Sequence, residues 1–93
     1  MRAEFKKSFQ RALKKYTVRQ QEDIFKSTQT LIDSIEKFQI PKGLGLKLLI
    51  AKPRIWEARV SLDMRIIFRY EEDLLEFSYV GSHNEIKRYL KTI

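Results

Sequence analysis

The sequence predicts an α+β fold in which two antiparallel N-terminal helices pack on one face of a four- to five-stranded, mainly antiparallel sheet, and a short helix closes the chain. Apolar residues in the first 38 positions recur at three- and four-residue steps, which is typical of amphipathic helices. After Gly43 the apolar residues recur at every second position, which is typical of half-buried strands. Residues 83–91 predict a short basic helix, with Ser82 or Asn84 able to cap its start.

Length and composition limit the class of protein. The 93 residues suffice for one domain, residues 1–93, with a single core. Without cysteine, neither a disulfide framework nor a thiolate metal site is expected. The longest apolar run, residues 48–51, is too short to span a membrane, and the first residues lack the apolar segment of a secretory signal. We therefore expect a cytoplasmic protein that contacts no membrane.

The N-terminal region predicts a short strand and two helices. Residues 1–5 alternate in polarity, which favours a strand, and residues 6–16 carry one apolar face with lysine and arginine around it. Residues 19–38 form the second helix, and Pro41 and Gly43 are expected to end the helical region. Its apolar stripe is assigned to the core: Ile24, Phe25, Leu31, Ile32, Ile35 and Phe38.

Four alternating segments predict the sheet. They cover residues 44–48, 56–61, 65–70 and 75–80, and short connections between them favour an antiparallel meander. The apolar positions of each segment face the helices. The opposite positions place a charged set on the second face of the sheet: Lys47, Glu57, Arg59, Arg65 and Arg69.

The charge balance predicts a polyanionic partner. Nineteen Lys and Arg against twelve Asp and Glu give a formal charge of +7 and a pI near 9.8. Such an excess attracts polyanions, among which nucleic acid is favoured over an acidic protein or a ribosomal surface.

His83 is the candidate proton-transfer group. It is the only histidine, and it lies at the junction of a strand and a helix, beyond Gly81. An arginine can neutralise charge on a phosphate oxygen, and a histidine can protonate a leaving oxygen, so His83 with Arg59 and Arg65 suits chemistry on a phosphodiester. Tyr89 could stack on a base or share in the proton transfer. RNA supplies its own nucleophile, the 2′-hydroxyl, so no metal and no cofactor are expected.

Structural roles remain open for the same residues. His83 could act only at the helix start, and Tyr89 could pack beneath the sheet. Arg59 and Arg65 could form surface ion pairs with Glu57, Asp63 or Glu76, each worth about 0–1 kcal/mol.

The chain resembles the RelE/ParE superfamily of toxins from prokaryotic toxin–antitoxin pairs. The resemblance covers nearly the whole chain and is most specific in W-E-A-R-V (residues 56–60), R-I-I-F (65–68) and V-G-S-H-N-E (80–85). It implies a RelE-like fold, a cognate antitoxin, and metal-independent cleavage of messenger RNA on the ribosome by attack of the 2′-hydroxyl. It further implies that Arg65 steadies the scissile phosphate, that His83 and Tyr89 transfer protons, and that Arg59 binds phosphate or stabilises the fold.

The chain also departs from the family pattern. Where RelE carries paired lysines, this chain has Trp56-Glu57-Ala58, so basic residues elsewhere would have to bind RNA: Lys47, Lys52 and Arg54. Where YafQ-like members carry an aromatic residue four positions after the histidine, this chain has Lys87, a further candidate for RNA binding. A ParE-like protein acting on gyrase, or a member that only binds RNA, is the alternative.

Overall fold

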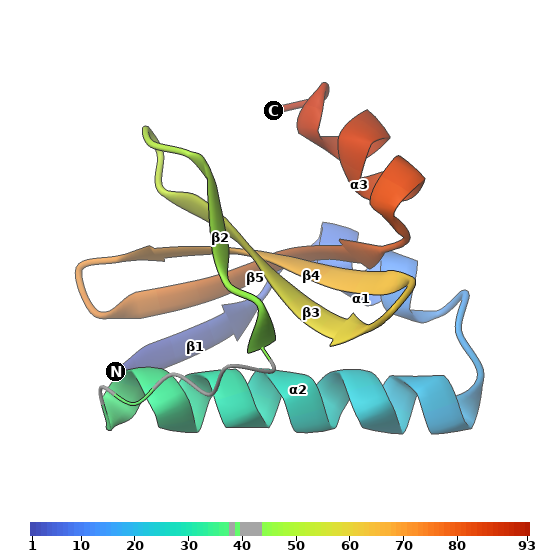
Figure 1. The fold of residues 1–93 in the computed structure, drawn as a ribbon, viewed down its shortest axis with the longest axis horizontal. Helices are drawn as coiled ribbons and strands as arrows, with labels where there is room; N and C mark the ends of the chain where they lie inside the picture. Colours follow the sequence, from blue (N-terminus) through green and yellow to red (C-terminus); the bar gives the residue numbers. More distant parts are fainter. Residues whose placement is uncertain (38, 40–43) are drawn as a thin grey trace.

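The computed structural model describes residues 1–37, 39 and 44–93. It contains a mixed sheet with helices on both faces (Figure 1). The strands are β1 (Arg2–Phe5), β2 (Lys47–Ile50), β3 (Ile55–Ser61), β4 (Met64–Glu71) and β5 (Leu74–Gly81), and the helices are α1 (Lys7–Leu13), α2 (Val18–Glu36) and α3 (His83–Leu90). The predicted α+β class, with two N-terminal helices and a short closing helix, is confirmed.

The sheet has the order β1-β5-β4-β3-β2. Strands β2 to β5 form the predicted antiparallel meander. The N-terminal strand β1 adds to the edge, parallel to β5, so that Arg2 lies opposite Leu74 and Phe5 opposite Phe77. Alternation in residues 1–5 predicted this strand, but it carried no information on its neighbour or its direction.

The main core lies between the sheet and helices α1 and α2. Its centre is an aromatic cluster in which the rings of Phe5 and Phe77 stack at 4.9 Å and Phe9 lies 5.3 Å from Phe5. Phe9, Phe77 and Leu31 are fully buried. Leu75 and Phe77 lie at alternate positions of β5, and Phe9 and Ala12 lie three residues apart on α1, so the strand period and the helix period meet on one apolar surface.

A second, smaller core covers part of the opposite face of the sheet. Ile55 of β3 and Ile67 of β4 pack there against Ile86 of α3. The second face was expected to be partly exposed to solvent. Helix α3 covers the part of this face that Ile55 and Ile67 form. Helix α3 follows β5 directly and lies on the side of the sheet away from α2 (Figure 1).

The structure corrects three details of the sequence prediction. Helix α2 ends at Glu36, and Phe38, Pro41 and Gly43 lie outside the described residues. Phe25, assigned to the core, is 45% exposed. The strand expected at residues 44–48 begins only at Lys47, because Gly45 has a left-handed φ of 53° that interrupts the extended backbone.

None of the helices described here is long and apolar enough to cross a membrane.

Candidate nucleic-acid interface

Strand register brings two arginines together on the face of the sheet that carries α3. Arg59 of β3 lies directly opposite Arg65 of β4, and Arg65 lies opposite Gly81 of β5. Residues opposed in this way have Cβ atoms about 4.5–5.5 Å apart. Two like charges so placed repel each other, and an anion between them would relieve the repulsion. The prediction that Arg59 and Arg65 share one face of the sheet is confirmed, and of their two strands only β4 lies beside β5, which leads into His83.

Arg65 is held by the turn that joins β3 to β4. Its Nη1 atom donates to the carbonyl oxygens of Ser61 at 2.8 Å and Leu62 at 3.1 Å. These bonds fix the guanidinium at the rim of the sheet and occupy one of its two terminal nitrogens. Within the described part of the chain, Arg65 forms no ion pair, and Glu76 pairs instead with Arg69 at 3.6 Å.

The side chain of Arg59 is exposed and is supported by the segment before β2. A Cβ atom placed on Gly45 would lie 3.6 Å from both Cβ and Nε of Arg59, so the backbone of Gly45 packs along this side chain. Among the described residues Arg59 has no acidic partner. The ion pairs considered as alternatives for Arg59 and Arg65 are thus not formed there.

His83 is the first residue of α3 and is exposed. It lies two residues after Gly81, the last residue of β5. Arg59, Arg65 and Gly81 form a row of opposed residues across β3, β4 and β5, and α3 begins at the β5 end of that row. Its imidazole has no hydrogen-bond partner in the described residues. Whether His83 acts on a substrate remains a prediction, since its position at the helix start is also consistent with a structural role.

A capping box fixes the start of α3. The Ser82 hydroxyl accepts a hydrogen bond from the Glu85 backbone N–H at 3.2 Å, and the Glu85 carboxylate accepts one from the Ser82 N–H at 2.8 Å. Gly81 packs closely beside it: a Cβ there would lie 3.0 Å from Glu85 Cβ and 3.1 Å from Tyr79 Cε2, so a larger residue would have to displace these side chains. The Ser-x-x-Glu spacing of residues 82–85 is the sequence signal that could have identified Glu85, which the prediction had left out.

Glu85 is also the electrostatic link between α3 and the α1–α2 connection. The hydrogen bond from the Ser82 backbone lowers the pKa of Glu85, Lys15 and Arg88 lower it further, and partial burial opposes them. Burial raises the pKa of Tyr16, and the nearby negative charge of Glu85 adds to this rise. The folded protein therefore favours the carboxylate form of Glu85, which accepts the hydrogen bond from the Ser82 N–H.

Tyr89 packs against the sheet. Its ring stacks on that of Tyr79 with centroids 4.4 Å apart and an interplanar angle of 3°. Six residues of α-helix separate it from His83, a rise of about 9 Å. The packing role considered for Tyr89 is present, and its part in proton transfer stays a prediction. Lys87 is exposed one turn from His83, on the same side of α3.

The remaining basic candidates are dispersed. Lys47 lies opposite Glu57, which offsets its charge on the same face as Arg59. The guanidinium carbon of Arg54 lies 6.0 Å from the centre of the Trp56 ring, and Trp56 packs on the helix-side core. Arg54 is therefore directed to the opposite face from Arg59 and Arg65. Lys52 is exposed in the connection between β2 and β3.

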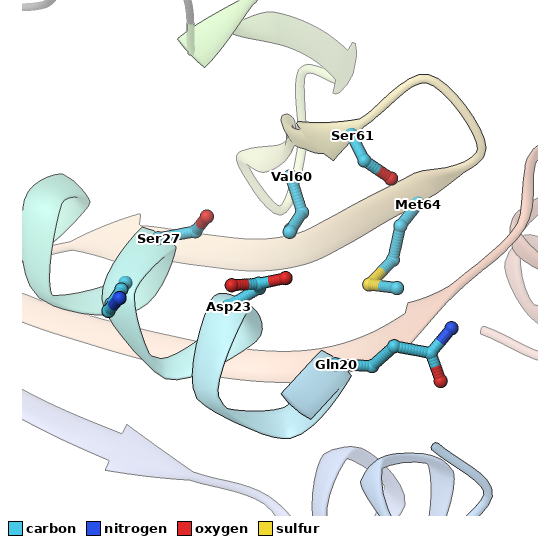
Figure 2. Close-up of a pocket in the computed structure, with 7 residues that line it drawn as sticks. Gln20, Asp23, Ser27, Val60, Ser61 and Met64 are labelled. Atoms are coloured by element: carbon cyan, nitrogen blue, oxygen red, sulfur yellow. The ribbon is translucent and has the colours of Figure 1, made fainter. Parts of the chain in front are cut away.

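A groove of about 480 Å³ lies between α2 and the β3–β4 hairpin, away from these candidates. Gln20, Asp23 and Ser27 project into it from α2 and face Val60, Ser61 and Met64 of the hairpin (Figure 2). It contains none of the predicted site residues. In residues 1–37, 39 and 44–93, no three His, Cys, Asp or Glu side chains gather in a way that could hold a metal ion.

No protein-family model matches the chain, and no curated protein sequence matches it. Solved structures do match. A copper-bound mutant toxin from Helicobacter pylori is 22% identical, over 92% of this chain and 98% of the other, with a TM-score of 0.75. The E. coli DinJ-YafQ complex matches at 19% identity over the same shares of both chains, with a TM-score of 0.74.

A more distant match extends the comparison. The archaeal RelE-RelB complex from Pyrococcus horikoshii matches at 15% identity over 87% of this chain and 92% of the other, with a TM-score of 0.64. These three matches cover 87–92% of this chain and 92–98% of the other chains. The protein thus has the fold of the RelE- and YafQ-type toxins.

Proposed function

We propose that this protein is the toxin of a toxin–antitoxin pair and that it cleaves messenger RNA on the ribosome, in the cytoplasm, without a metal. The fold supports the proposal, because its structural neighbours are toxins solved alone or in complexes such as DinJ-YafQ and RelE-RelB. The formal charge of +7 supports a polyanionic substrate. The proposal includes a cognate antitoxin as the protein partner.

One observation carries the catalytic part of the proposal. The opposed pair Arg59 and Arg65 continues across β5 into the start of α3, where His83 is exposed. A phosphodiester bound by the two guanidinium groups would lie at the end of the sheet where α3 begins with the exposed His83. Cations fixed in position before the substrate arrives stabilise charge that develops during the reaction, and this is often the largest catalytic contribution.

The proposed reaction is a transesterification. The ribose 2′-hydroxyl gives its proton to a base, which is Tyr89 or a solvent water, and its oxygen forms a bond to phosphorus while the bond from phosphorus to O5′ breaks. His83, as imidazolium, donates a proton to the departing O5′, and the products are a 2′,3′-cyclic phosphate and a 5′-hydroxyl end. Arg59 and Arg65 offset the charge on the non-bridging oxygens. Tyr89 assists as base or as a stacking group, and its stacked contact with Tyr79 favours the second role.

The test is cleavage of messages by the purified protein on translating ribosomes. The wild type should give 5′ ends at codon-phased positions, matched by 2′,3′-cyclic phosphates. His83→Ala should lower the cleavage rate by roughly 10²–10⁴-fold. Asn84→Ala, a neighbouring exposed residue on the same helix, is the matched control and should leave the rate unchanged. Equal rates for both variants would contradict the proposed role of His83.

A binding module without nuclease activity is the second candidate. It is favoured by the three hydrogen bonds from Arg65 Nη1 to backbone carbonyls, at 2.8, 3.1 and 3.4 Å, which suit a structural role for this side chain. A ParE-like protein would act on gyrase. DNA damage in cells with intact messages would support that activity, and intact messages with RNA bound would support an RNA-binding protein.

A further inference from the structure

The groove between α2 and the β3–β4 hairpin, which we call the α2–hairpin groove, has no part in the reaction described above. Its volume of about 480 Å³ falls within the range of about 300–1,000 Å³ that is usual for small-ligand sites. One wall is the first half of α2, and the other is the end of the hairpin (Figure 2). The two walls differ in chemistry, and together they define what the groove can bind.

The α2 wall carries two opposite charges. Asp23 and Lys26 both line the groove and lie three residues apart, so they are neighbours on one side of the helix. Within residues 1–37, 39 and 44–93, neither side chain takes part in an ion pair. Figure 2 shows the Asp23 carboxylate in the space between α2 and the hairpin, with Ser27 beside it. This wall therefore presents a hydrogen-bond acceptor and a donor side by side.

The hairpin wall is mainly apolar. Val60 of β3 and Met64 of β4 line it, and Met64 is buried, so its position is fixed by the core. The Met64 sulfur is directed into the groove (Figure 2). A thioether sulfur makes favourable contacts with aromatic rings. A flat aromatic ligand with polar groups on one edge therefore fits this groove better than a saturated ligand.

The charges narrow the ligand further. Asp23 is the one carboxylate among the described lining residues, which is too few ligands for a metal ion, and its charge would repel a phosphate group. A wholly apolar ligand would bury Asp23 and Lys26 without partners, which is unfavourable. The ligand that satisfies both needs donors for the carboxylate and an acceptor for the ammonium group on the same edge.

The groove shares the β3–β4 turn with the candidate RNA interface. Ser61 lines the groove, and its carbonyl oxygen accepts the hydrogen bond from Arg65 Nη1 at 2.8 Å. The Arg65 side chain and the groove thus lie on the two sides of one turn. A nucleotide that flanks a phosphate bound at Arg65 can reach around this turn, whereas the start of α3 lies farther away, beyond Gly81.

We propose that the α2–hairpin groove binds a guanine base of the RNA, from a nucleotide that flanks the phosphate held by Arg65. Asp23 accepts hydrogen bonds from the N1–H and the N2 amino group, Lys26 donates to O6, and Met64 contacts the ring. Adenine has an amino group but no carbonyl, and uracil has carbonyls but no amino group. Cytosine has both, but its ring nitrogen between them is an acceptor, which Asp23 would repel. The proposal rests on RNA being the substrate and adds a sequence preference to it.

Binding of short 2′-O-methyl RNA oligonucleotides, which are not cleaved, tests the preference by fluorescence polarisation. The sequences are oligouridylates of equal length that carry one central guanosine, adenosine, cytidine or uridine. The wild type should bind the guanosine oligonucleotide at least about fivefold more tightly than each of the others. Asp23→Ala should reduce this preference to within about twofold.

Glu22→Ala is the matched control. Glu22 is an exposed neighbour on α2 that does not line the groove, and its replacement removes the same charge, so the preference should be kept. Alanine favours helix at both positions, and circular dichroism checks that both variants are folded. In ¹⁵N spectra of the wild type, the amides of Asp23 and Ser27 should shift with the guanosine oligonucleotide and not with the uridine one.

The proposal is overturned if no oligonucleotide binds, if guanosine gives no preference, or if both variants change the preference equally. It is also overturned if the preference persists in Asp23→Ala, because guanine is then recognised elsewhere. The cleavage mechanism is tested separately. A guanine preference in a protein that leaves messages intact on ribosomes would support the groove and refute only the mechanism, whereas cleavage without that preference would refute only the groove.

Discussion

The cap of α3 gives the sharpest prediction, because the chain contains its own control. Ser82 caps α3 and Thr17 caps α2, each in a complete capping box, and in both the hydroxyl accepts from the N3 backbone N–H at 3.2 Å. Replacing either cap by alanine removes one such bond and leaves an N–H of the first turn without its partner. The expected loss is about 1 kcal/mol for each.

The two variants should therefore melt alike. In a domain of this size, 1 kcal/mol corresponds to a fall in Tm of about 4–8 °C, measured by circular dichroism. Their activities should differ. Ser82 directly precedes His83, so Ser82→Ala loosens the backbone that positions the imidazole. A displacement of the order of 1 Å at a reacting group can cost about 10²-fold in rate.

Ser82→Ala should accordingly reduce RNA cleavage by about 10- to 100-fold at a temperature where both variants are folded. Thr17→Ala should reduce it less than about twofold, because α2 lies on the other face of the sheet. Equal activities at equal Tm would refute the reasoning that the start of α3 positions a catalytic group.

Three further predictions concern charge, packing and RNA affinity. The folded state lowers the pKa of Glu85 from its ordinary value of 4.5, so the stability that this carboxylate contributes is present above that value and is lost as the pH falls through the lowered pKa. The stability difference between wild type and Glu85→Gln should thus shrink in urea titrations taken from about pH 7 to pH 3, and a constant difference would contradict it. Phe77→Ala, at a fully buried ring, should lower the free energy of unfolding by about 3–5 kcal/mol in urea denaturation, and a loss below about 1 kcal/mol would contradict the aromatic core. Arg59→Ala should reduce the slope of log affinity against log salt for single-stranded RNA by about 0.7, as expected for one phosphate contact, whereas Asn84→Ala should leave that slope unchanged.

Periodicity was sufficient to predict the layers of the fold. Alternation in residues 56–61, 65–70 and 75–80 identified three strands to within a residue or two, because both faces of each strand have distinct surroundings. The parallel pairing of β1 with β5 could not be predicted, since alternation in a four-residue edge strand does not specify its neighbour. The start of β2 was misplaced because Gly45 adopts a left-handed φ of 53°, which the alternation of polar and apolar residues does not reveal.

The candidate site was predictable only in part. Which strand face carries Arg59 and Arg65 follows from the pleat, and the structure confirms that they are neighbours. Where a long side chain directs its charge does not follow from sequence. Arg54 extends over Trp56 toward the helix side, and Tyr89 is committed to stacking on Tyr79 by the position of α3. Both arrangements result from tertiary contacts that no local pattern encodes.

The central claim is that RNA binds where the arginine pair of β3 and β4 meets the start of α3. Titration of ¹⁵N-labelled protein with a single-stranded 2′-O-methyl RNA, which lacks the free hydroxyl needed for cleavage, tests it directly by NMR. The account predicts the largest amide shifts at Arg59, Arg65, Gly81 and His83. Largest shifts on α1 and α2, with those four amides unmoved, would contradict it.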